Sequence, residues 1–317
     1  YEIKECDWSS DVCSSDLIQV NDWTLDEFKT IMSTQVLNQI ETFYLCGTFG
    51  DPMMNKDLIE MCRYAKETNP KLYIHIHTNG GARKEEWWRE LAIVLPKNHN
   101  VHIAIDGLED THHLYRQDTD WHRIIEHAQA LIAAGGHAWW RFIPFEHNQH
   151  QEADCRQLAR ELGFENFENI YDGRDNGPVF DRYGNFSHQI GTDTRPAHIV
   201  PDIKPLLESH VTWYNAKTIQ HPKDTTELNI QCLHKQNREI YLAADGSVYP
   251  CCFLGFYPQT MNHPGNQELR KLVHENNALE YPLEHCLNWF DQIEQSWQAA
   301  SIAQGRTYQC VTTCNRL

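Results

Sequence analysis

The sequence predicts an α/β fold with a parallel sheet, followed by a small α+β module. Short apolar runs recur between residues 40 and 170, and amphipathic helical segments separate them. Strands that alternate with helices pair in parallel through right-handed crossovers, so we expect a sheet curved into a partial or full barrel. A cysteine-bearing hairpin and helical segments after residue 229 indicate the small module.

The elements of the larger part follow in chain order. Thr24 and Glu27 have the spacing of a capping box, which predicts a helix ahead of the first strand. The predicted strands are residues 42–46, 72–77, 101–105, 138–143 and 166–170. Gly135 and Gly163 stand where helices are expected to end. The apolar faces of two covering helices are Leu58, Ile59, Cys62 and Ala65, and Ile124, Ile125, Ala128, Leu131 and Ile132.

The rest of the chain has a different character. Residues 172–228 are polar, carry several prolines and show no clean period, so we interpret them as a connecting region. In the module that follows, residues 239–242 and 247–252 flank Asp245-Gly246, a favourable hairpin turn. Helices are expected near residues 267–275 and 285–300, ahead of a terminal cysteine loop.

The first seventeen residues do not have the character of a natural protein sequence. Residues 7–17 match the translation of a DNA stretch that resembles a standard sequencing adapter, and the residues before them fit its outer arm and index. Segments of this origin are excluded from fold reasoning. We therefore expect that residues 1–17 are an artefact, that Cys6 and Cys13 are not ligands, and that the natural chain continues upstream of Ile18.

Composition and charge restrict the classes of partner. A formal net charge of −17 argues against a nucleic-acid or anionic-membrane surface. No apolar run reaches membrane-spanning length. The chain has 11 unevenly spaced cysteines, which favours a reducing cytoplasm with metal-bound and buried free thiols over a disulfide framework. Cys46, Cys62 and Cys155, on strands or apolar faces, are expected to be buried free thiols.

Four cysteines near the end of the chain have the pattern of a metal-ligand set. The run reads Cys232-x13-Gly246-x4-Cys251, and after a long gap Cys310-x3-Cys314. Thiolates brought together from a hairpin and a terminal loop suit a four-cysteine iron–sulfur cluster. The same four could equally hold zinc, because spacing alone does not name the metal.

Two other cysteines compete for this role. Cys252 is the neighbour of Cys251, and we prefer Cys251 because the glycine-x4-cysteine spacing selects it. Cys286 opens a predicted helix and is expected to be buried, although it could replace one ligand. The choice of the four therefore stays open at these positions.

Polar motifs follow three of the predicted strands. Gly50-Asp51-Pro52 follows the first, Thr78-Asn79-Gly80 ends the next, and Ile105-Asp106-Gly107 ends the third, with Tyr115-Arg116 shortly after. Each alone is ordinary turn chemistry. Together, at the carboxyl ends of successive parallel strands, they indicate a ligand site.

In this order the motifs resemble the barrel of radical S-adenosylmethionine (radical SAM) enzymes. The hairpin segment, residues 240–252, is similar to the auxiliary-cluster module called SPASM, or twitch in its shorter form. The resemblance covers nearly all of residues 18–317. It implies a partial (β/α)6 TIM-like barrel lacking its first strand at residues 18–171, the connecting region at 172–228, and an α+β iron–sulfur module at 229–317.

The resemblance also implies an activity and its cofactors. In the family, a Cys-x3-Cys-x2-Cys motif binds a catalytic 4Fe–4S cluster that chelates S-adenosyl-L-methionine. Reductive cleavage then gives a 5′-deoxyadenosyl radical, which takes a hydrogen from an unknown peptide or small-molecule substrate. An electron donor such as flavodoxin or ferredoxin is implied. Residues 18–317 lack the motif, so we expect it upstream of Ile18 and expect the chain as written to be inactive.

Cofactor contacts are implied at the strand-end motifs. By the family pattern, Gly50, Asp51 and Pro52 bind the methionine amino group of the cofactor. Most members have Gly-Gly-Glu-Pro there, so Phe49 and Asp51 are departures, and the shorter acid reaches less far.

The remaining implied contacts lie after the later strands. Asn79 and Asp106 are implied to lie near the ribose and the substrate. Ala104 stands where many relatives have serine, which removes one expected hydroxyl contact. Arg116 is implied to serve a carboxylate of the cofactor or the substrate; a solvent-facing charge at a helix entry is the alternative.

In the module, the resemblance implies an auxiliary 4Fe–4S cluster held by Cys232, Cys251, Cys310 and Cys314. Two rival functions remain. One is a non-catalytic zinc- or iron–sulfur-binding module on a barrel scaffold. The other is a degenerate paralogue that binds the cofactor or a partner without cleaving the cofactor.

Overall fold

The computed structural model divides into two compact units, Glu2–Asp202 and Ile203–Leu317. We call them the sheet unit and the cysteine unit. The structure describes residues 22–46, 50–96, 99–170, 177–180, 186–190, 230–255, 269, 271 and 273–314. The adapter-like segment, Phe49, most of the connecting region and most of the helix expected near residues 267–275 lie outside these residues.

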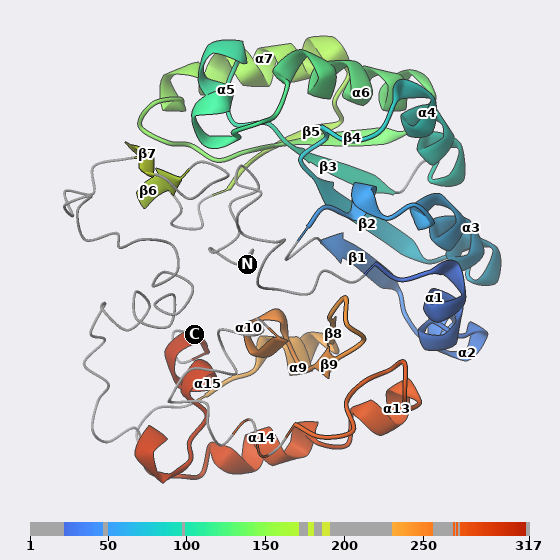
Figure 1. The fold of residues 1–317 in the computed structure, drawn as a ribbon, viewed down its shortest axis with the longest axis vertical. Helices are drawn as coiled ribbons and strands as arrows, with labels where there is room; N and C mark the ends of the chain where they lie inside the picture. Colours follow the sequence, from blue (N-terminus) through green and yellow to red (C-terminus); the bar gives the residue numbers. More distant parts are fainter. Residues whose placement is uncertain are drawn as a thin grey trace. The chain divides into compact units, whose positions relative to one another are not determined.

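The sheet unit contains a five-stranded parallel sheet with the strand order β1-β2-β3-β4-β5 (Figure 1). The strands are β1 (Thr42–Cys46), β2 (Tyr73–Thr78), β3 (Asn100–Ala104), β4 (His137–Phe142) and β5 (Asn166–Asn169). All four pairings are parallel, and β1 and β5 form the two edges of the sheet. This confirms the predicted α/β class and all five predicted strands, with shifts of one residue at several ends.

Helices connect and cover the strands. The α-helices are α1 (Leu25–Ile31), α2 (Thr34–Leu37), α3 (Leu58–Thr68), α4 (Glu85–Val94), α5 (Glu109–Tyr115), α6 (Trp121–Ala133) and α7 (Glu152–Leu162). Short 3-10 helices are η2 (Pro52–Met54) and η3 (Gln149–Gln151). The capping box at the start of α1 is present, because the Thr24 hydroxyl accepts from the Glu27 amide and Glu27 accepts from the Thr24 amide.

The two faces of the sheet differ in chemistry. Side chains alternate along a strand, and in β2 the residues Ile74, Ile76 and Thr78 are buried while the alternate residues are only partly buried. Helices α3, α4, α6 and α7 lie along one side of the sheet in Figure 1. The predicted apolar face of α3 is buried throughout, and in the α6 face only Ile132 is partly exposed. We call the opposite face, to which Tyr73, His75 and His77 belong, the polar face.

Three free thiols of the sheet unit were predicted to be buried. Cys62 and Cys155 are buried, as expected, and burial raises the pKa of each thiol to about 12. The prediction for Cys46 is wrong, because this residue is exposed at the end of edge strand β1. An edge strand has a neighbour on one side only, and a sequence pattern does not reveal which strand that is.

Two short antiparallel strands lie in the region interpreted as connecting. Strands β6 (Gly177–Phe180) and β7 (Phe186–Ile190) pair with a register shift at Val179/Phe180. Ile190 is buried with Tyr115, Ile143 and Phe145. The described part of the region thus packs on the sheet unit.

The cysteine unit is built from short elements. They are α9 (Leu233–Asn237), β8 (Tyr241–Leu242), β9 (Val248–Tyr249), α10 (Cys252–Gly255), α13 (Leu283–Cys286), α14 (Phe290–Ser296), η6 (Ile302–Gln304) and α15 (Tyr308–Thr313). Strands β8 and β9 form the expected antiparallel hairpin. The α+β character predicted for this part is therefore present among the described residues, and in the segment 285–300 helix α14 spans only Phe290–Ser296.

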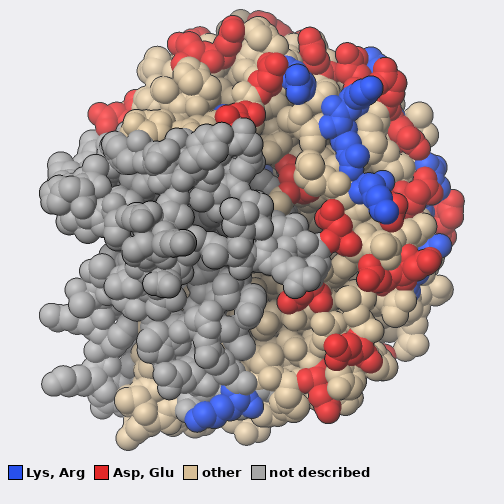
Figure 2. All heavy atoms as spheres, viewed as in Figure 1, with Lys and Arg blue, Asp and Glu red and all other residues tan. Residues whose placement is uncertain are grey.

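Acidic side chains outnumber basic ones on the visible described surface (Figure 2). Figure 2 shows acidic side chains spread over the visible part of the described surface, with fewer basic ones among them. No helix in the described part of the chain is both long enough and apolar enough to cross a membrane.

Candidate functional site

The carboxyl edge of the sheet brings the predicted strand-end motifs together. Because β1 to β5 are parallel, the residues that follow them gather at one edge. The Asp51 Oδ2 atom accepts hydrogen bonds from the Asn79 backbone N at 2.7 Å and from the Thr78 hydroxyl at 2.9 Å. The Asp51 Oδ1 atom accepts from the Met53 amide at 2.9 Å. The loop after β1 is thereby tied to the end of β2.

This geometry gives Asp51 an organising role. Burial raises the pKa of the Asp51 carboxyl, and the hydrogen bonds from Asn79, Met53 and Thr78 act in the opposite direction because they stabilise the carboxylate. The carboxylate holds the Asn79 backbone in place at the end of β2. The predicted contact of Asp51 with an amino group stays a prediction.

Asp106 and Arg116 form a buried ion pair. The Arg116 Nε atom donates to the Asp106 Oδ2 atom at 2.7 Å, and the Ile143 amide donates to Asp106 Oδ1 at 2.6 Å. Their side chains are 0% and 3% exposed. The solvent-facing alternative for Arg116 is wrong. Asp106 holds the guanidinium at this edge and links β3 to the end of β4.

A pocket joins two of the predicted site residues. Its lining is His77, Thr78, Asn79, His102, Ala104, Arg116 and Arg141. Asn79 and Arg116 thus line the same cavity. Asp51 is not a lining residue, but it accepts a hydrogen bond from the backbone of Asn79. The lining holds two guanidinium groups, and each has a carboxylate beside it, Asp106 at Arg116 and Glu168 at Arg141. Gly50 and Pro52 flank Asp51 in the chain and are not lining residues.

The polar face carries a network that extends this pocket. The His75 Nδ1 and His102 Nε2 atoms lie 3.1 Å apart, and the His77 ring stacks on His102 with centroids 4.3 Å apart. The Arg141 Nη1 atom lies 2.6 Å from His77 Nδ1, and Glu168 lies 3.7 Å from Arg141 Nε. His75 and His77 alternate along β2 and therefore lie on the same face of the sheet. Arg141 and Glu168 were missed, although Arg141 alternates with Trp140 and Phe142 in β4 in the same way.

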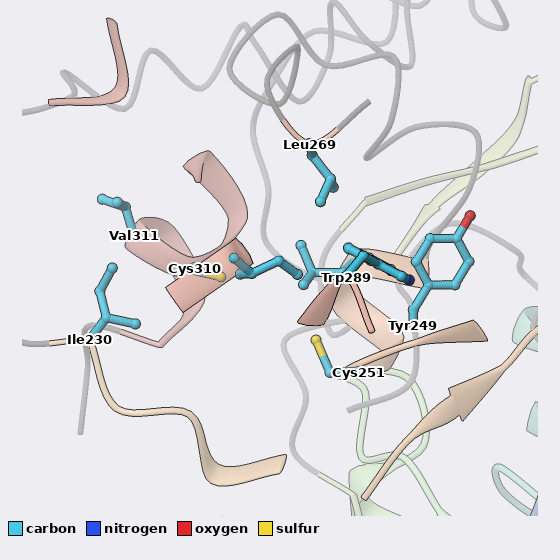
Figure 3. Close-up of a cluster of buried hydrophobic side chains, with 9 residues drawn as sticks. Ile230, Tyr249, Cys251, Leu269, Trp289, Cys310 and Val311 are labelled. Carbon is cyan, nitrogen blue, oxygen red and sulfur yellow. The ribbon is translucent and has the colours of Figure 1, made fainter. Parts of the chain in front are cut away.

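The cysteine unit buries thiols in an apolar core. Cys251 and Cys310 are 6% and 7% exposed and pack with Tyr249, Trp289 and Ile230. Figure 3 shows Cys251 below Trp289, with its sulfur directed into this cluster, and Cys310 on the neighbouring α15. Cys314 packs against the cluster as a partly buried residue. We call these side chains the cysteine core.

The pKa values of the thiols in the cysteine core are raised. Burial raises the pKa of the Cys314 thiol to about 11, and the charges of Cys232 and Cys252 add to the increase. Burial raises the pKa of Cys251 well above its usual range, and Cys310, Cys252 and Cys314 add to it in the same way. Thiols in this environment become thiolates only beside a strong positive charge, which a metal supplies.

The structure does not arrange these residues as a ligand set. Among the described residues, no group of three or more His, Cys, Asp or Glu side chains is positioned to hold a metal ion. Cys232, Cys251, Cys310 and Cys314 fit a metal centre in donor chemistry and in the dry surroundings of Cys251 and Cys310. Their role as ligands, and the choice between Cys251 and Cys252, stay predictions. Cys286 is buried, and its thiol donates to the Tyr281 carbonyl at 3.7 Å.

The hairpin that precedes Cys251 needs its glycine. Gly246 has φ +89°, and a Cβ atom there would lie 2.5 Å from the Asn277 Oδ1 atom. The Gly246 amide donates to the Ala243 carbonyl and closes the turn. The glycine-x4-cysteine spacing therefore has a physical basis, because the turn fixes where the chain leaves β9 and reaches Cys251.

Comparison with known proteins identifies the fold. No family model matches the chain, and no curated protein matches it. Among solved structures, SuiB of Streptococcus suis bound to S-adenosylmethionine has a TM-score of 0.55 at 12% identity, and the match covers 93% of this chain and 64% of SuiB. The fold resembles that of SuiB. At this identity the similarity concerns the fold alone.

Other solved structures are similar at lower scores. The protein anSMEcpe with bound AdoMet has a TM-score of 0.49 at 16% identity, with 97% of this chain and 89% of that chain covered. SuiB bound to the precursor peptide SuiA also has a TM-score of 0.49, at 12% identity, with 84% of this chain and 58% of that chain covered. The chain spans less than two thirds of the length of SuiB.

Proposed function

We propose that this chain is the S-adenosylmethionine-binding barrel and auxiliary-cluster module of a radical SAM enzyme. The observation that carries the proposal is the pocket at the carboxyl edge of the sheet. It brings Asn79 and Arg116, from two separate strand-end motifs, to one polar cavity in a fold like that of SuiB.

The chain's own residues have distinct tasks in this proposal. Asp51 fixes the Asn79 backbone, and Asp106 fixes Arg116, so both cofactor-facing groups are held before a ligand arrives. Arg116 and Arg141 favour a carboxylate, which the methionine part of the cofactor carries. Such preorganisation reduces the cost of ordering side chains on binding.

The hard chemistry belongs to the cofactors. Bound to a reduced 4Fe–4S cluster, S-adenosylmethionine supplies a radical that removes a hydrogen atom from the substrate. The residues of the polar face, including His77, His102 and Arg141, would orient the substrate and exclude water beside that centre. The substrate is a peptide or a small molecule, and an electron donor such as flavodoxin or ferredoxin would supply the electron.

The cysteine unit holds an auxiliary 4Fe–4S cluster in this proposal. Cys232, Cys251, Cys310 and Cys314 are the proposed ligands, and the burial of Cys251 and Cys310 in one core, with Cys314 packed against it, supports this choice. Its role is to pass an electron or to keep the substrate site closed.

Two measurements test the proposal. The first reads the codons upstream of Ile18 in the source gene, where we expect Cys-x3-Cys-x2-Cys. The second follows 5′-deoxyadenosine formation by the protein encoded by that gene, after anaerobic reconstitution with iron and sulfide and reduction by dithionite. A restored sequence without the three cysteines, or no deoxyadenosine from a fully loaded protein, would exclude radical catalysis.

A pair of variants separates the pocket from the general fold. Arg141→Gln removes a positive charge from the lining, and we expect about tenfold weaker binding of S-adenosylmethionine. Arg63→Gln changes an exposed arginine of α3 and should leave binding unchanged. If both variants bind S-adenosylmethionine equally well, the binding site is not at this pocket.

The rival function is a zinc-binding module on the same scaffold. Four thiols, two of them buried, suit zinc as well as an iron–sulfur cluster. A colourless chain that retains one zinc after iron and sulfide treatment would support this rival and exclude the cluster.

A further inference from the structure

An arginine outside the pocket makes a second connection between the loops that follow β1 and β2. The Arg83 Nε atom donates to the Met53 carbonyl at 2.6 Å, and its Nη2 atom donates to the Met54 carbonyl at 2.9 Å. Both carbonyls belong to the last two residues of η2. The last carbonyls of a helix have no partner inside the helix. Arg83 supplies these partners from the loop between β2 and α4.

This connection complements the one made by Asp51. The Asp51 carboxylate belongs to the loop after β1 and accepts from the Asn79 amide, in the loop after β2, at 2.7 Å. The Arg83 guanidinium belongs to the loop after β2 and donates back to the loop after β1. Hydrogen bonds that involve a charged group are stronger than those between neutral groups. We call this set the loop contact; its residues are Asp51, Met53, Met54, Asn79 and Arg83.

The backbone of Arg83 is strained. Its φ angle is +74°, in the left-handed region that residues with a Cβ atom rarely adopt. Such a conformation costs free energy and persists only where surrounding contacts hold it. Here the two carbonyls hold the guanidinium, which also lies over the Trp87 ring, 5.7 Å from the ring centroid. A glycine at this position would relieve the strain but would lose these contacts.

The loop contact bears on the pocket through Asn79, which lines it. The Gly81 amide donates to the Asn79 Oδ1 atom at 2.9 Å, so the orientation of this side chain follows the course of the loop. Gly80 and Gly81 stand between Asn79 and Arg83, and glycine restricts the backbone least. Asp51 and Arg83 hold the two ends of this short segment, and together they limit its freedom.

We propose that Arg83 is a positioning residue that keeps Asn79 at the wall of the pocket. The proposal rests on the proposed function, in which Asn79 faces S-adenosylmethionine. Arg83 is not a lining residue, so it acts on a ligand only through the two loops. Without its guanidinium, the loop after β2 opens more often. A ligand must then order this loop when it binds, which weakens its affinity.

The first measurement is hydrogen exchange of the Asn79 amide in the full chain, without ligand, in the parent and in Arg83→Gly. This amide is protected by its hydrogen bond to Asp51 while the loops are in contact. We expect about tenfold faster exchange in the variant, because a hydrogen bond from a charged group contributes at least about this factor. The urea midpoint of unfolding should stay near the parental value, since glycine relieves the left-handed strain.

The second measurement is S-adenosylmethionine binding by equilibrium dialysis of the same two chains. We expect about tenfold weaker binding by Arg83→Gly. Millimolar guanidinium chloride should restore part of the affinity of the variant and slow the exchange of its Asn79 amide. The free ion carries the same donors as the lost side chain and can bind the same carbonyls. A general loss of stability would not be reversed by this ion.

A matched control exists in the cysteine unit. Arg238 is exposed and has φ +57°, so Arg238→Gly makes the same change of side chain at the same kind of backbone. It should leave both the exchange of the Asn79 amide and the binding of S-adenosylmethionine at the parental values. Equal effects of the two substitutions would overturn the proposal, because the losses would then not depend on the loop contact.

The outcomes separate the role of Arg83 from the proposed function. Parental exchange at Asn79 in Arg83→Gly would overturn the role of Arg83. Faster exchange with parental affinity would overturn it as well, because the loop contact would then not act on the binding site. A parent chain that binds no S-adenosylmethionine would contradict the proposed function, and the exchange of Asn79 would still decide whether Arg83 holds this loop.

A second substitution covers a failure of Arg83→Gly to fold. Asparagine also tolerates the left-handed conformation, and its side chain is too short to replace the guanidinium, so Arg83→Asn should show the same two effects. Loss of cooperative unfolding in both variants would assign Arg83 to the stability of the whole sheet unit and overturn the proposal.

Discussion

The sheet unit and the cysteine unit treat their buried polar groups in different ways. In the sheet unit, Asp106 is fully buried, and its carboxylate is paired with Arg116 and with a backbone amide. In the cysteine unit, Cys251 and Cys310 are buried in an apolar core, and this burial, with a smaller contribution from neighbouring thiols, raises the pKa of each. The sheet unit pairs a buried carboxylate with a buried guanidinium, whereas the cysteine unit collects buried thiols in one apolar core.

The two units also differ in the amount of regular secondary structure that they contain. The sheet unit has a five-stranded sheet with helices along it, whereas the hairpin strands of the cysteine unit are two residues long. A small unit buries a smaller fraction of its surface, and metal sites often supply the missing stability. We therefore expect the sheet unit to fold on its own interactions and the cysteine unit to depend on its metal.

The largest expected effect is the loss of the metal centre from the reconstituted chain. Cys251→Ser should remove most of the bound metal and the ordered state of the cysteine unit, because binding free energy in such sites is folding free energy. Metal analysis and hydrogen exchange measure the two effects. Cys62→Ser changes a buried thiol of the sheet unit and should leave the metal content at the parental value. Similar metal loss in both variants would contradict the comparison.

A large effect is also expected in the sheet unit from Asp106→Asn. This change leaves the Arg116 guanidinium buried without its counter-charge, so the free energy of unfolding should fall by about 3–5 kcal/mol. Urea unfolding of the sheet unit measures it, and the metal content should not change. Glu60→Gln breaks the exposed pair with Arg63 and should cost less than about 1 kcal/mol. A loss below about 1 kcal/mol for Asp106→Asn would mean that the ion pair is not structural.

A smaller effect is expected at the hairpin turn. Gly246→Ala places a side chain at φ +89° and brings its Cβ against Asn277, so we expect a loss of about 2 kcal/mol in the cysteine unit. Gly135→Ala has nearly the same φ, +91°, with nothing within 4 Å of the added Cβ. The control should cost about 1 kcal/mol, from backbone strain alone. Thermal unfolding compares the stability of the two variants. Equal losses of stability would show that the contact with Asn277 adds no further cost.

The smallest effect is a pH dependence of the sheet unit. Burial, with smaller effects from the charges of Arg116 and His113, lowers the pKa of His112 to about 3. The folded ring stays neutral, accepting from the Asp106 amide through Nδ1, while the unfolded ring takes up a proton below about pH 6.5. Stability is therefore fully present above pH 6.5 and is lost as the pH falls toward 3.

Between pH 7 and 5.5 we expect a loss of about 1 kcal/mol from His112. Urea unfolding at the two pH values measures this loss. In the His112→Gln variant, the difference in unfolding free energy between the two pH values should be smaller by that amount. A difference that does not change in the variant would assign the pH dependence to other groups.

Much of the sheet unit could be predicted from the sequence, because its signals are local. Short apolar runs marked the strands, and the Thr24–Glu27 spacing marked the start of α1. The exposure of Cys46 could not be predicted, since it depends on β1 being an edge strand. The Asp106–Arg116 pair was also missed as a pair, although both residues were singled out separately.

In the candidate site, the sequence alone determined which residue types stand after each strand and which cysteines follow the Gly246 turn. Only the tertiary structure decided that Asn79 and Arg116 share a pocket, that Arg141 joins them from β4, and that Cys251 and Cys310 share one core. The physical reason is the range of the interactions. Turns and strand alternation act between neighbours in the chain, whereas a pocket depends on which strands pair and on what each buried group meets.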